Sequence, residues 1–312
     1  MNKKKLIVLL ISILVLLPAL IMSCKAEEDD EDDSSAMWAG IRVSEYGMAE
    51  SYGYGARNFP DIATMTEFGD KMTSCFVESK GAYIMIVGTV DEDTWNCHLD
   101  FPLSKEIESA YGSEEDFYEP YLTALDAAGY SVWLQVEPGN ADLLELAKEV
   151  MNHYKHHKCV KGFGIDVEWY KPEGTNGRGT KLNSTTAGNV LAEVRKVKQS
   201  YTVFVKHWDK KWLPGVIDGL IYVNDSQGFW AREDYTALER MTNEFSAWAE
   251  NYAPCPVMFQ IGYESDKSGI WGSMTNPVKE LGTAIADACT SGNRIGIIWV
   301  DFTLKEAMRK IK

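Results

Sequence analysis

Eight short apolar segments recur along the chain from residue 37 onward, and longer segments of mixed polarity separate them. Each apolar segment is too uniformly hydrophobic for a strand with one solvated face. Strands that are buried on both faces and alternate with helices predict a parallel sheet. The eight predicted strands are residues 38–43, 83–87, 132–136, 162–167, 202–206, 220–223, 257–261 and 295–300.

The segments between these strands carry the period of an amphipathic helix. In residues 141–154, the apolar positions recur at the i, i+3, i+4, i+7 spacing and share one helix face. Similar stripes run through residues 189–197, 239–248 and 277–288. Eight β/α units in about 275 residues match the size of a closed barrel, for which about 250 is typical. We therefore predict an α/β fold, a (β/α)8 TIM barrel that forms a single domain over residues 37–312.

An open, doubly wound sheet is the alternative arrangement of the same units. No G-x-G-x-x-G motif follows a predicted strand, and no G-x-x-x-x-G-K-[ST] motif occurs, which disfavours a nucleotide-binding sheet. We expect no cofactor.

The first 23 residues have the pattern of a secretory signal. Three lysines precede an apolar run over residues 6–21, and a small residue, Ser23, stands before Cys24. The end of the run resembles the lipobox of bacterial lipoproteins, in which the cysteine is acylated and becomes the mature N-terminus. We therefore predict a lipid anchor at Cys24 and a location in the cell envelope, outside the cytoplasm. An uncleaved anchor is the alternative.

Residues 24–36 are predicted to form an acidic tether, because seven consecutive acidic residues repel one another and cannot bury apolar surface. The net charge of −15 disfavours a phosphate-tracking surface, so we expect no nucleic-acid partner. Contact with the membrane should come through the lipid alone. The sequence leaves the oligomeric state open.

Five cysteines follow Cys24, and no C-x-x-C motif occurs. They are Cys75, Cys97, Cys159, Cys255 and Cys289. An odd number cannot form a complete disulfide framework. We predict mostly buried thiols, with at most one or two disulfides.

Polar side chains follow most of the predicted strands, where the loops of a (β/α)8 barrel build an active site. The fourth strand is the most informative, because Asp166 and Glu168 share one face under strand alternation. Two carboxylates held close together in a half-dry site raise each other's pKa, which favours one protonated acid. An ion pair with Lys206 is the structural alternative. Glu137, at the end of the third strand, is the second catalytic candidate, although it could instead cap the next helix.

Residues 162–168, GFGIDVE, resemble the fourth-strand signature D-G-x-D-x-D-x-E of chitinase-type (family 18) glycoside hydrolases. The resemblance implies that Glu168 is the general acid and that Asp166 positions a substrate acetamido group. Lys161 and Gly164 replace the first and middle Asp of the signature. Without the middle Asp, we expect either a sugar that lacks an N-acetyl group or direct participation of a protein carboxylate. Trp299 resembles the eighth-strand Trp of this family, which implies that its ring forms the floor of a sugar subsite.

Aromatic residues also gather at the predicted strand ends, and flat rings stack on the C–H faces of sugars. The six are Trp169, Tyr170, Trp208, Trp230, Trp271 and Trp299. We expect about half of them to serve packing instead. The predicted substrate-binding residues are Trp169, Tyr170, Lys206, His207, Trp208, Asp225, Gln260, Trp299 and Asp301.

Three histidines, His153, His156 and His157, stand near one predicted helix end. His153 and His157 have the spacing of H-E-x-x-H, but Tyr154 occupies the position of the catalytic Glu. A solvated helix end explains them, so we predict no metal site there.

These patterns predict a lipid-anchored glycoside hydrolase that acts on an oligosaccharide or polysaccharide, with Glu168 as general acid. Glu137, Asp225 or Asp301 would supply the second carboxylate. One alternative is a non-catalytic barrel that captures glycans at the cell surface. Another is a metal-assisted hydrolase, such as a deacetylase, that uses His207 with carboxylates.

Overall fold

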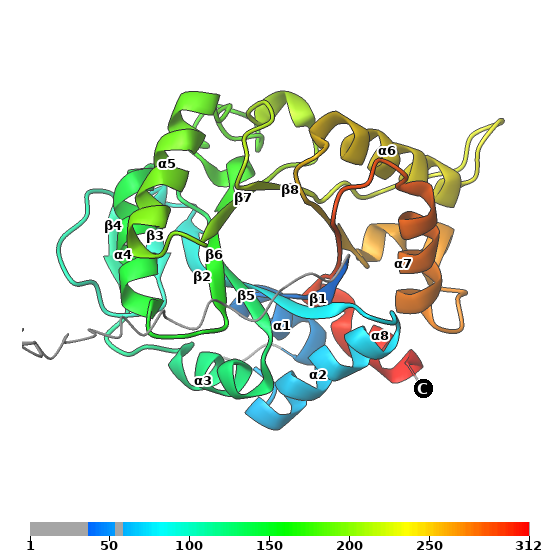
Figure 1. Ribbon diagram of the computed structural model, residues 1–312, viewed down its shortest axis with the longest axis horizontal. Helices are drawn as coiled ribbons and strands as arrows, with labels where there is room; N and C mark the ends of the chain where they lie inside the picture. Colours follow the sequence, from blue (N-terminus) through cyan, green and yellow to red (C-terminus); the bar gives the residue numbers. More distant parts are fainter. Residues whose placement is uncertain (1–36, 54–58, 312) are drawn as a thin grey trace, which may run out of the picture. The chain divides into compact units, whose positions relative to one another are not determined.

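The computed structural model describes residues 37–53 and 59–311 (Figure 1). The predicted signal, the acylated Cys24 and the acidic tether lie outside these residues. Among the helices that are described, none has both the length and the apolar character needed to cross a membrane.

Eight parallel strands form a closed ring, which Figure 1 shows in view down the barrel. β1 pairs with both β2 and β10, and this double pairing closes the sheet. The prediction of a (β/α)8 barrel is therefore confirmed, and the open sheet is wrong. The barrel strands are β1 (Met37–Val43), β2 (Lys80–Asp91), β5 (Ser131–Val136), β6 (Val160–Asp166), β7 (Thr202–Lys206), β8 (Leu220–Asn224), β9 (Val257–Ile261) and β10 (Ile295–Trp299).

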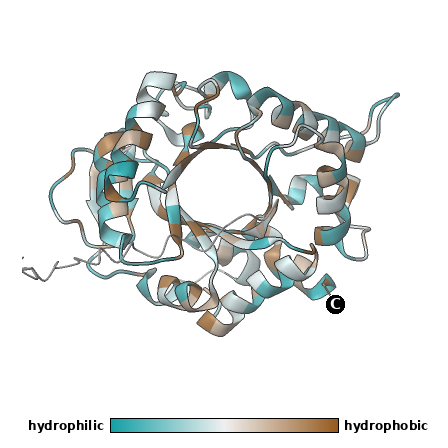
Figure 2. Ribbon diagram, viewed as in Figure 1, coloured by the Kyte–Doolittle hydropathy of each residue, from teal (hydrophilic) through white to brown (hydrophobic). Residues whose placement is uncertain are grey.

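Helices surround the ring, with their apolar faces turned toward the strands (Figure 2). Polar side chains begin several of them: Asp142 accepts hydrogen bonds from the first turn of α4, and Thr236 and Glu239 form a capping box on α6. The helices are α1 (Glu45–Tyr52), α2 (Ile62–Ser74), α3 (Glu119–Ala128), α4 (Leu143–Tyr154), α5 (Ser184–Val197), α6 (Ala237–Tyr252), α7 (Pro277–Ala288) and α8 (Leu304–Lys310).

The barrel contains two separate apolar cores, one on each face of the sheet. The inner core fills the barrel, and Trp38 and Trp133 meet in it edge to face, with ring centroids 5.1 Å apart. The outer core lies between strands and helices. Because both faces are buried, the strands read as continuous apolar segments, as predicted.

The packing of the inner core explains why residue 164 is a glycine. A Cβ at this position would lie 2.1 Å from the Phe204 ring, closer than any real contact. Phe204 on β7 therefore occupies the space into which a larger residue at position 164 would project. An aspartate at this position, as in the middle of the signature D-G-x-D-x-D-x-E, would clash with this ring.

Two strands were not predicted. β2 runs past the barrel rim and pairs antiparallel with β3 (Asn96–Leu99), which pairs with β4 (Ala110–Gly112). These strands are three and four residues long, too short for a clear apolar pattern. The five cysteines that the structure describes are free, and only Cys289 is partly exposed, which agrees with the predicted buried thiols.

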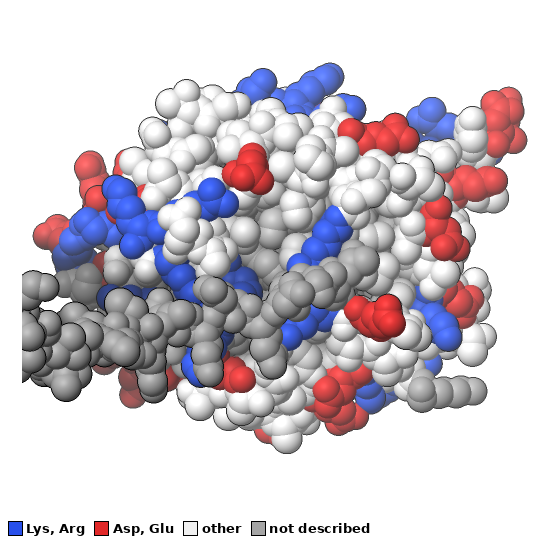
Figure 3. Space-filling model, in the orientation of Figure 1, with Lys and Arg blue, Asp and Glu red and all other residues white. Residues whose placement is uncertain are grey.

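Charged side chains of both signs are interspersed on the face that Figure 3 shows.

Candidate active site

A buried lysine joins two carboxylates at the carboxyl ends of neighbouring strands. Lys206 Nζ lies 2.9 Å from Asp166 Oδ2 and 2.6 Å from Asp225 Oδ2, and all three side chains are at most 5% exposed. The register of β6 and β7 places Asp166 opposite Lys206. The ion pair considered from the sequence is therefore present, and Asp225 extends it into a triad.

Asp166 is held from two sides. Gln135 Nε2 on β5 donates to Oδ2 over 3.1 Å, while Oδ1 is buried without a partner among the described residues. Burial raises the pKa of Asp166, and the Lys206 charge opposes the shift.

Glu168 does not continue the strand, because β6 ends at Asp166 and residues Val167–Trp169 form a 3-10 turn. The strand alternation used in the prediction therefore stops two residues early. The turn leaves Glu168 partly exposed. Burial raises the pKa of Glu168 to about 8, with the Asp166, Asp225 and Glu137 carboxylates adding to the shift and Lys206 opposing it.

Glu168 opens onto a cavity of about 730 Å³. This volume falls within the roughly 300–1,000 Å³ of ligand sites. Loops that follow β6, β7 and β8 form its walls together with α6. Lining residues include Glu168, Arg178, Trp208, Asp225, Ser226, Gln227, Trp230, Arg240 and Glu244.

Trp230 forms an exposed aromatic wall of this cavity. Its side chain is 60% exposed, and the Arg240 guanidinium lies 4.5 Å from its ring centroid. Arg240 Nη1 also donates to the Trp230 carbonyl over 2.7 Å. Arg178, Arg240 and Glu244 were missed from the sequence. The sequence signal for Arg178 is its place in the Gly-rich segment that follows Glu168. The signal for Arg240 and Glu244 is the i, i+4 spacing that puts them on one face of α6.

Glu137 lies deeper than Glu168 and is not among the residues that line the cavity. The Tyr46 hydroxyl donates to its Oε1 over 2.8 Å, and the Val90 N–H donates to its Oε2 over 3.1 Å. Burial raises the pKa of Glu137 to about 7, and the Asp166 carboxylate adds to the shift. The helix-cap alternative for Glu137 is wrong, because Asp142 caps α4.

Asp301 is fully engaged by protein donors. Arg42 donates to Oδ1 from Nε over 3.1 Å and from Nη2 over 2.6 Å. Ser44 donates to Oδ2 from its N–H over 2.5 Å and from its hydroxyl over 2.6 Å. These contacts fasten the segment after β10 to the end of β1, so the geometry does not support Asp301 as a second carboxylate.

His207 is fully buried, and the backbone engages both ring nitrogens. Nδ1 accepts from the Asp209 N–H over 2.8 Å, so the neutral ring carries its proton on Nε2, which donates to the Arg178 carbonyl over 3.0 Å. Burial lowers the pKa of His207. The ring therefore positions the loop that carries Arg178, and it is not free to bind a metal, as the metal-assisted alternative requires.

Trp299 does not fit its predicted role. Ile298 takes the inward position on β10, so Trp299 points outward and is fully buried, 5.5 Å from the Trp271 ring. Both tryptophans serve packing. Trp169 and Tyr170 are partly buried and are not among the residues that line the cavity, whereas Trp208 is. Gln260 is buried, and its Nε2 has no partner within the described residues.

The comparisons with known proteins support the fold. No protein-family model matches the chain, and no curated protein matches it in sequence. The structure resembles endoglycoceramidase II from Rhodococcus sp., with a TM-score of 0.53 and 10% identity over 87% of this chain and 75% of that chain. It also matches the β-1,4-D-mannanase from Cryptopygus antarcticus, at a TM-score of 0.45 and 10% identity over 89% of this chain and 90% of that chain.

A match to the β-glucuronidase from Parabacteroides merdae has a TM-score of 0.46 and 11% identity over 84% of this chain. The chain spans only 31% of that protein's length. At this level of identity, the similarity to endoglycoceramidase II shows that the chain shares a TIM-barrel fold.

Proposed function

We propose that this protein is a glycoside hydrolase that cleaves an oligosaccharide or polysaccharide, with Glu168 as the general acid. The position and pKa of the Glu168 carboxyl group carry the proposal. It faces a ligand-sized cavity, and its pKa of about 8 keeps it protonated at neutral pH. A protonated carboxylic acid beside a glycosidic oxygen can donate the proton that the leaving group needs.

Asp225 is the second carboxylate of the proposed mechanism. Of the three candidates, it alone lines the same cavity as Glu168. Lys206 fixes its Oδ2, and its Oδ1 has no partner within the described part of the chain. Asp225 can therefore act on the sugar directly or through a water molecule, while Asp166 remains buried and anchors Lys206.

The cavity walls suit a sugar ligand. Trp208 and the exposed Trp230 offer ring faces for stacking, and Arg178, Ser226 and Gln227 offer polar groups for hydroxyls. The fold of endoglycoceramidase II and the resemblance to family 18 at residues 162–168 support the same class of substrate. Because Phe204 fills the place of the middle acid, we favour a sugar without an N-acetyl group.

The pH dependence tests the role of Glu168. Because the acid must be protonated, kcat/KM on a cleaved glycan should fall as pH rises through about 8. The measurement is a rate profile from about pH 5 to about pH 10 on a substrate found in a broad glycan panel. A rate that stays constant up to about pH 10 would remove Glu168 as the acid. Glycan binding without any hydrolysis would favour the capture alternative, which the replacements at Lys161 and Gly164 support.

We further propose that a lipid on Cys24 anchors the protein outside the cytoplasm, as the lipobox resemblance suggests. Cys24→Ala should move the protein from the membrane fraction to the soluble fraction or leave an uncleaved precursor. Fractionation with labelled fatty acid measures both outcomes. Equal membrane association without label in the wild type and the variant would contradict acylation.

A further inference from the structure

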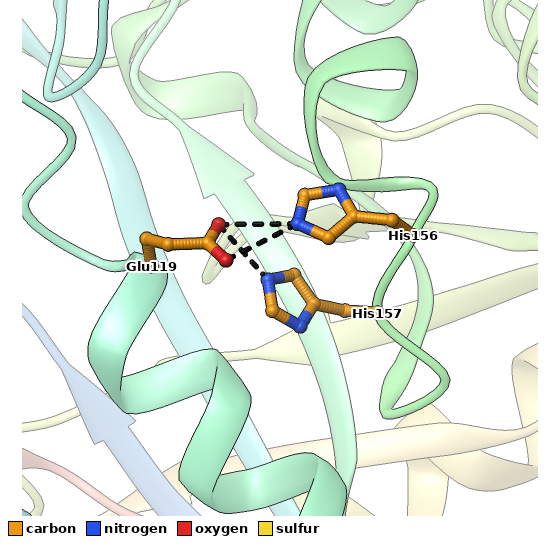
Figure 4. Close-up of side chains that lie close together, drawn as sticks. All are labelled: Glu119, His156 and His157. Atoms are coloured by element: carbon orange, nitrogen blue, oxygen red, sulfur yellow. Dashed lines mark hydrogen bonds and ion pairs between the residues drawn. The ribbon is translucent and has the colours of Figure 1, made fainter.

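A cluster of two histidines and a glutamate lies outside the barrel mouth, between α3 and the turn that follows α4 (Figure 4). Glu119 comes from the first turn of α3, and His156 and His157 precede β6. His156 Nε2 lies 3.2 Å from both oxygens of Glu119, and His157 Nε2 lies 3.1 Å from Oε2. The pair that the sequence spacing had singled out, His153 and His157, is not the pair that meets.

The other nitrogen of each ring, Nδ1, already contacts a hydrogen-bond acceptor. His156 Nδ1 lies 3.1 Å from the His153 carbonyl, and His157 Nδ1 lies 2.8 Å from Asp126 Oδ2. Both partners are acceptors, so each Nδ1 carries the proton. In the neutral rings, both Nε2 atoms then point a lone pair at a carboxylate, which also only accepts. A cation between these three groups would satisfy all of them.

Two kinds of cation satisfy this arrangement: a proton on each ring, or one metal ion. Two protons would place two charged imidazolium rings beside each other, with centroids 4.1 Å apart, between the Glu119 and Asp126 carboxylates. A single divalent ion replaces both protons without that repulsion.

The spacing also fits a metal. Tetrahedral zinc has Zn–N and Zn–O bonds of about 2.0–2.1 Å, which separates neighbouring ligand atoms by about 3.3 Å. The distances from each Nε2 to the Glu119 carboxylate, 3.1–3.2 Å, are close to this edge, and the candidate ligand atoms of all three residues lie within 4.8 Å of one another. A histidine whose second nitrogen donates to a carboxylate or a backbone carbonyl is also the usual support for a metal ligand.

We propose that Glu119, His156 and His157 bind one divalent transition-metal ion of the zinc class, and that the ion ties α3 to the turn before β6. Two His and one Glu form a known zinc ligand set, and imidazole favours this class of metal. The His157 side chain is 3% exposed, whereas His156 and Glu119 are 54% and 42% exposed, so solvent can supply the remaining ligand.

A neighbouring group, Asp126, His157 and Cys159, is a weaker candidate. Asp126 Oδ1 already accepts from the Cys159 N–H over 2.6 Å, and its Oδ2 accepts from His157. Its oxygens support His157 rather than an ion.

Titration of the purified, metal-free protein with Zn²⁺ tests the proposal. We expect one tight site in the wild type and a higher unfolding temperature with metal. Glu119→Gln and His156→Ala should each lower the affinity by more than the ~10–100-fold that a lost supporting residue costs. Co²⁺ should give the visible absorption of a tetrahedral site in the wild type and not in these variants.

His153→Gln is the matched control. His153 lies in the last turn of α4, just before His156 and His157, and its Nε2 contacts a carboxylate, Asp116, over 2.6 Å, but it is not part of the cluster. Tight binding that survives in His153→Gln and is lost in the two cluster variants supports the site. Absence of tight binding in the wild type, or equal affinity in all four proteins, as binding to the acidic residues 27–33 would give, overturns it.

Discussion

Replacement of Glu168 by Gln is expected to lower kcat by about 10²–10⁴-fold and to leave glycan affinity within a few-fold of the wild type. The amide has nearly the shape of the protonated acid, so the cavity should still bind its ligand. It has no acidic proton to give to the leaving group, and the fall in activity above about pH 8 should vanish with it. Rate assays on the best glycan of the panel, together with binding measurements, test both effects.

Glu173→Gln provides the control for this substitution. Glu173 is an exposed residue of the segment that follows Glu168, so the same chemical change should leave kcat unaltered. Unchanged turnover in Glu168→Gln would refute the central claim. Equal losses in both variants would point to a general effect of the loop rather than to acid catalysis.

Lys206→Met is expected to lower the free energy of unfolding by about 3–5 kcal/mol, the usual cost of removing one partner of a buried ion pair. The substitution leaves Asp166 and Asp225 buried without their shared cation. Burial already raises the pKa of Asp166, and loss of the opposing Lys206 charge raises it further. A raised carboxyl pKa costs stability as pH rises above its unfolded value of about 3.9. The loss should therefore be larger at about pH 8 than at about pH 5. Urea unfolding at both pH values measures it.

Lys196→Met is the control for this substitution, because Lys196 has an ion pair of the same length on the exposed surface. Lys196 Nζ lies 2.6 Å from Glu193 Oε2, as close as Lys206 to Asp225, but its side chain is 71% exposed. An exposed pair contributes only about 0–1 kcal/mol. If Lys206→Met costs no more than Lys196→Met at both pH values, the triad is not the stabilising ion cluster that its geometry indicates.

The barrel could be predicted from the sequence because each strand shows its burial in its own run of residues. A strand buried on both faces is apolar at most positions, and the eight segments show this directly. The meeting of Asp166 with Lys206 was also within reach, because β6 and β7 are neighbours in the chain and in the sheet.

Other parts of the site depend on information that a linear pattern lacks. The role of Trp299 turns on which alternate residue faces inward, and an apolar segment such as Ile295–Trp299 gives no sign of that choice. The 3-10 turn at Glu168 interrupts an alternation that the sequence continues. Arg240 reaches the cavity only because the chain between β8 and α6 folds back beside that helix, and Glu119 meets His156 only through helix packing.

The residues that close the barrel and the residues that form the cavity lie at the ends of different strands. Arg42, Ser44 and Asp301 lock β1 to the segment after β10, while the cavity walls come from the segments after β6, β7 and β8. Residues 230–236, which include Trp230, are all exposed, and the loop that carries them projects beyond the ring in Figure 1. Inherited changes in this segment can therefore alter which ligand is accepted without weakening the scaffold. Ligand choice can therefore change through this exposed segment, whereas Asp225 serves both the cavity and the buried ion cluster and is constrained by both.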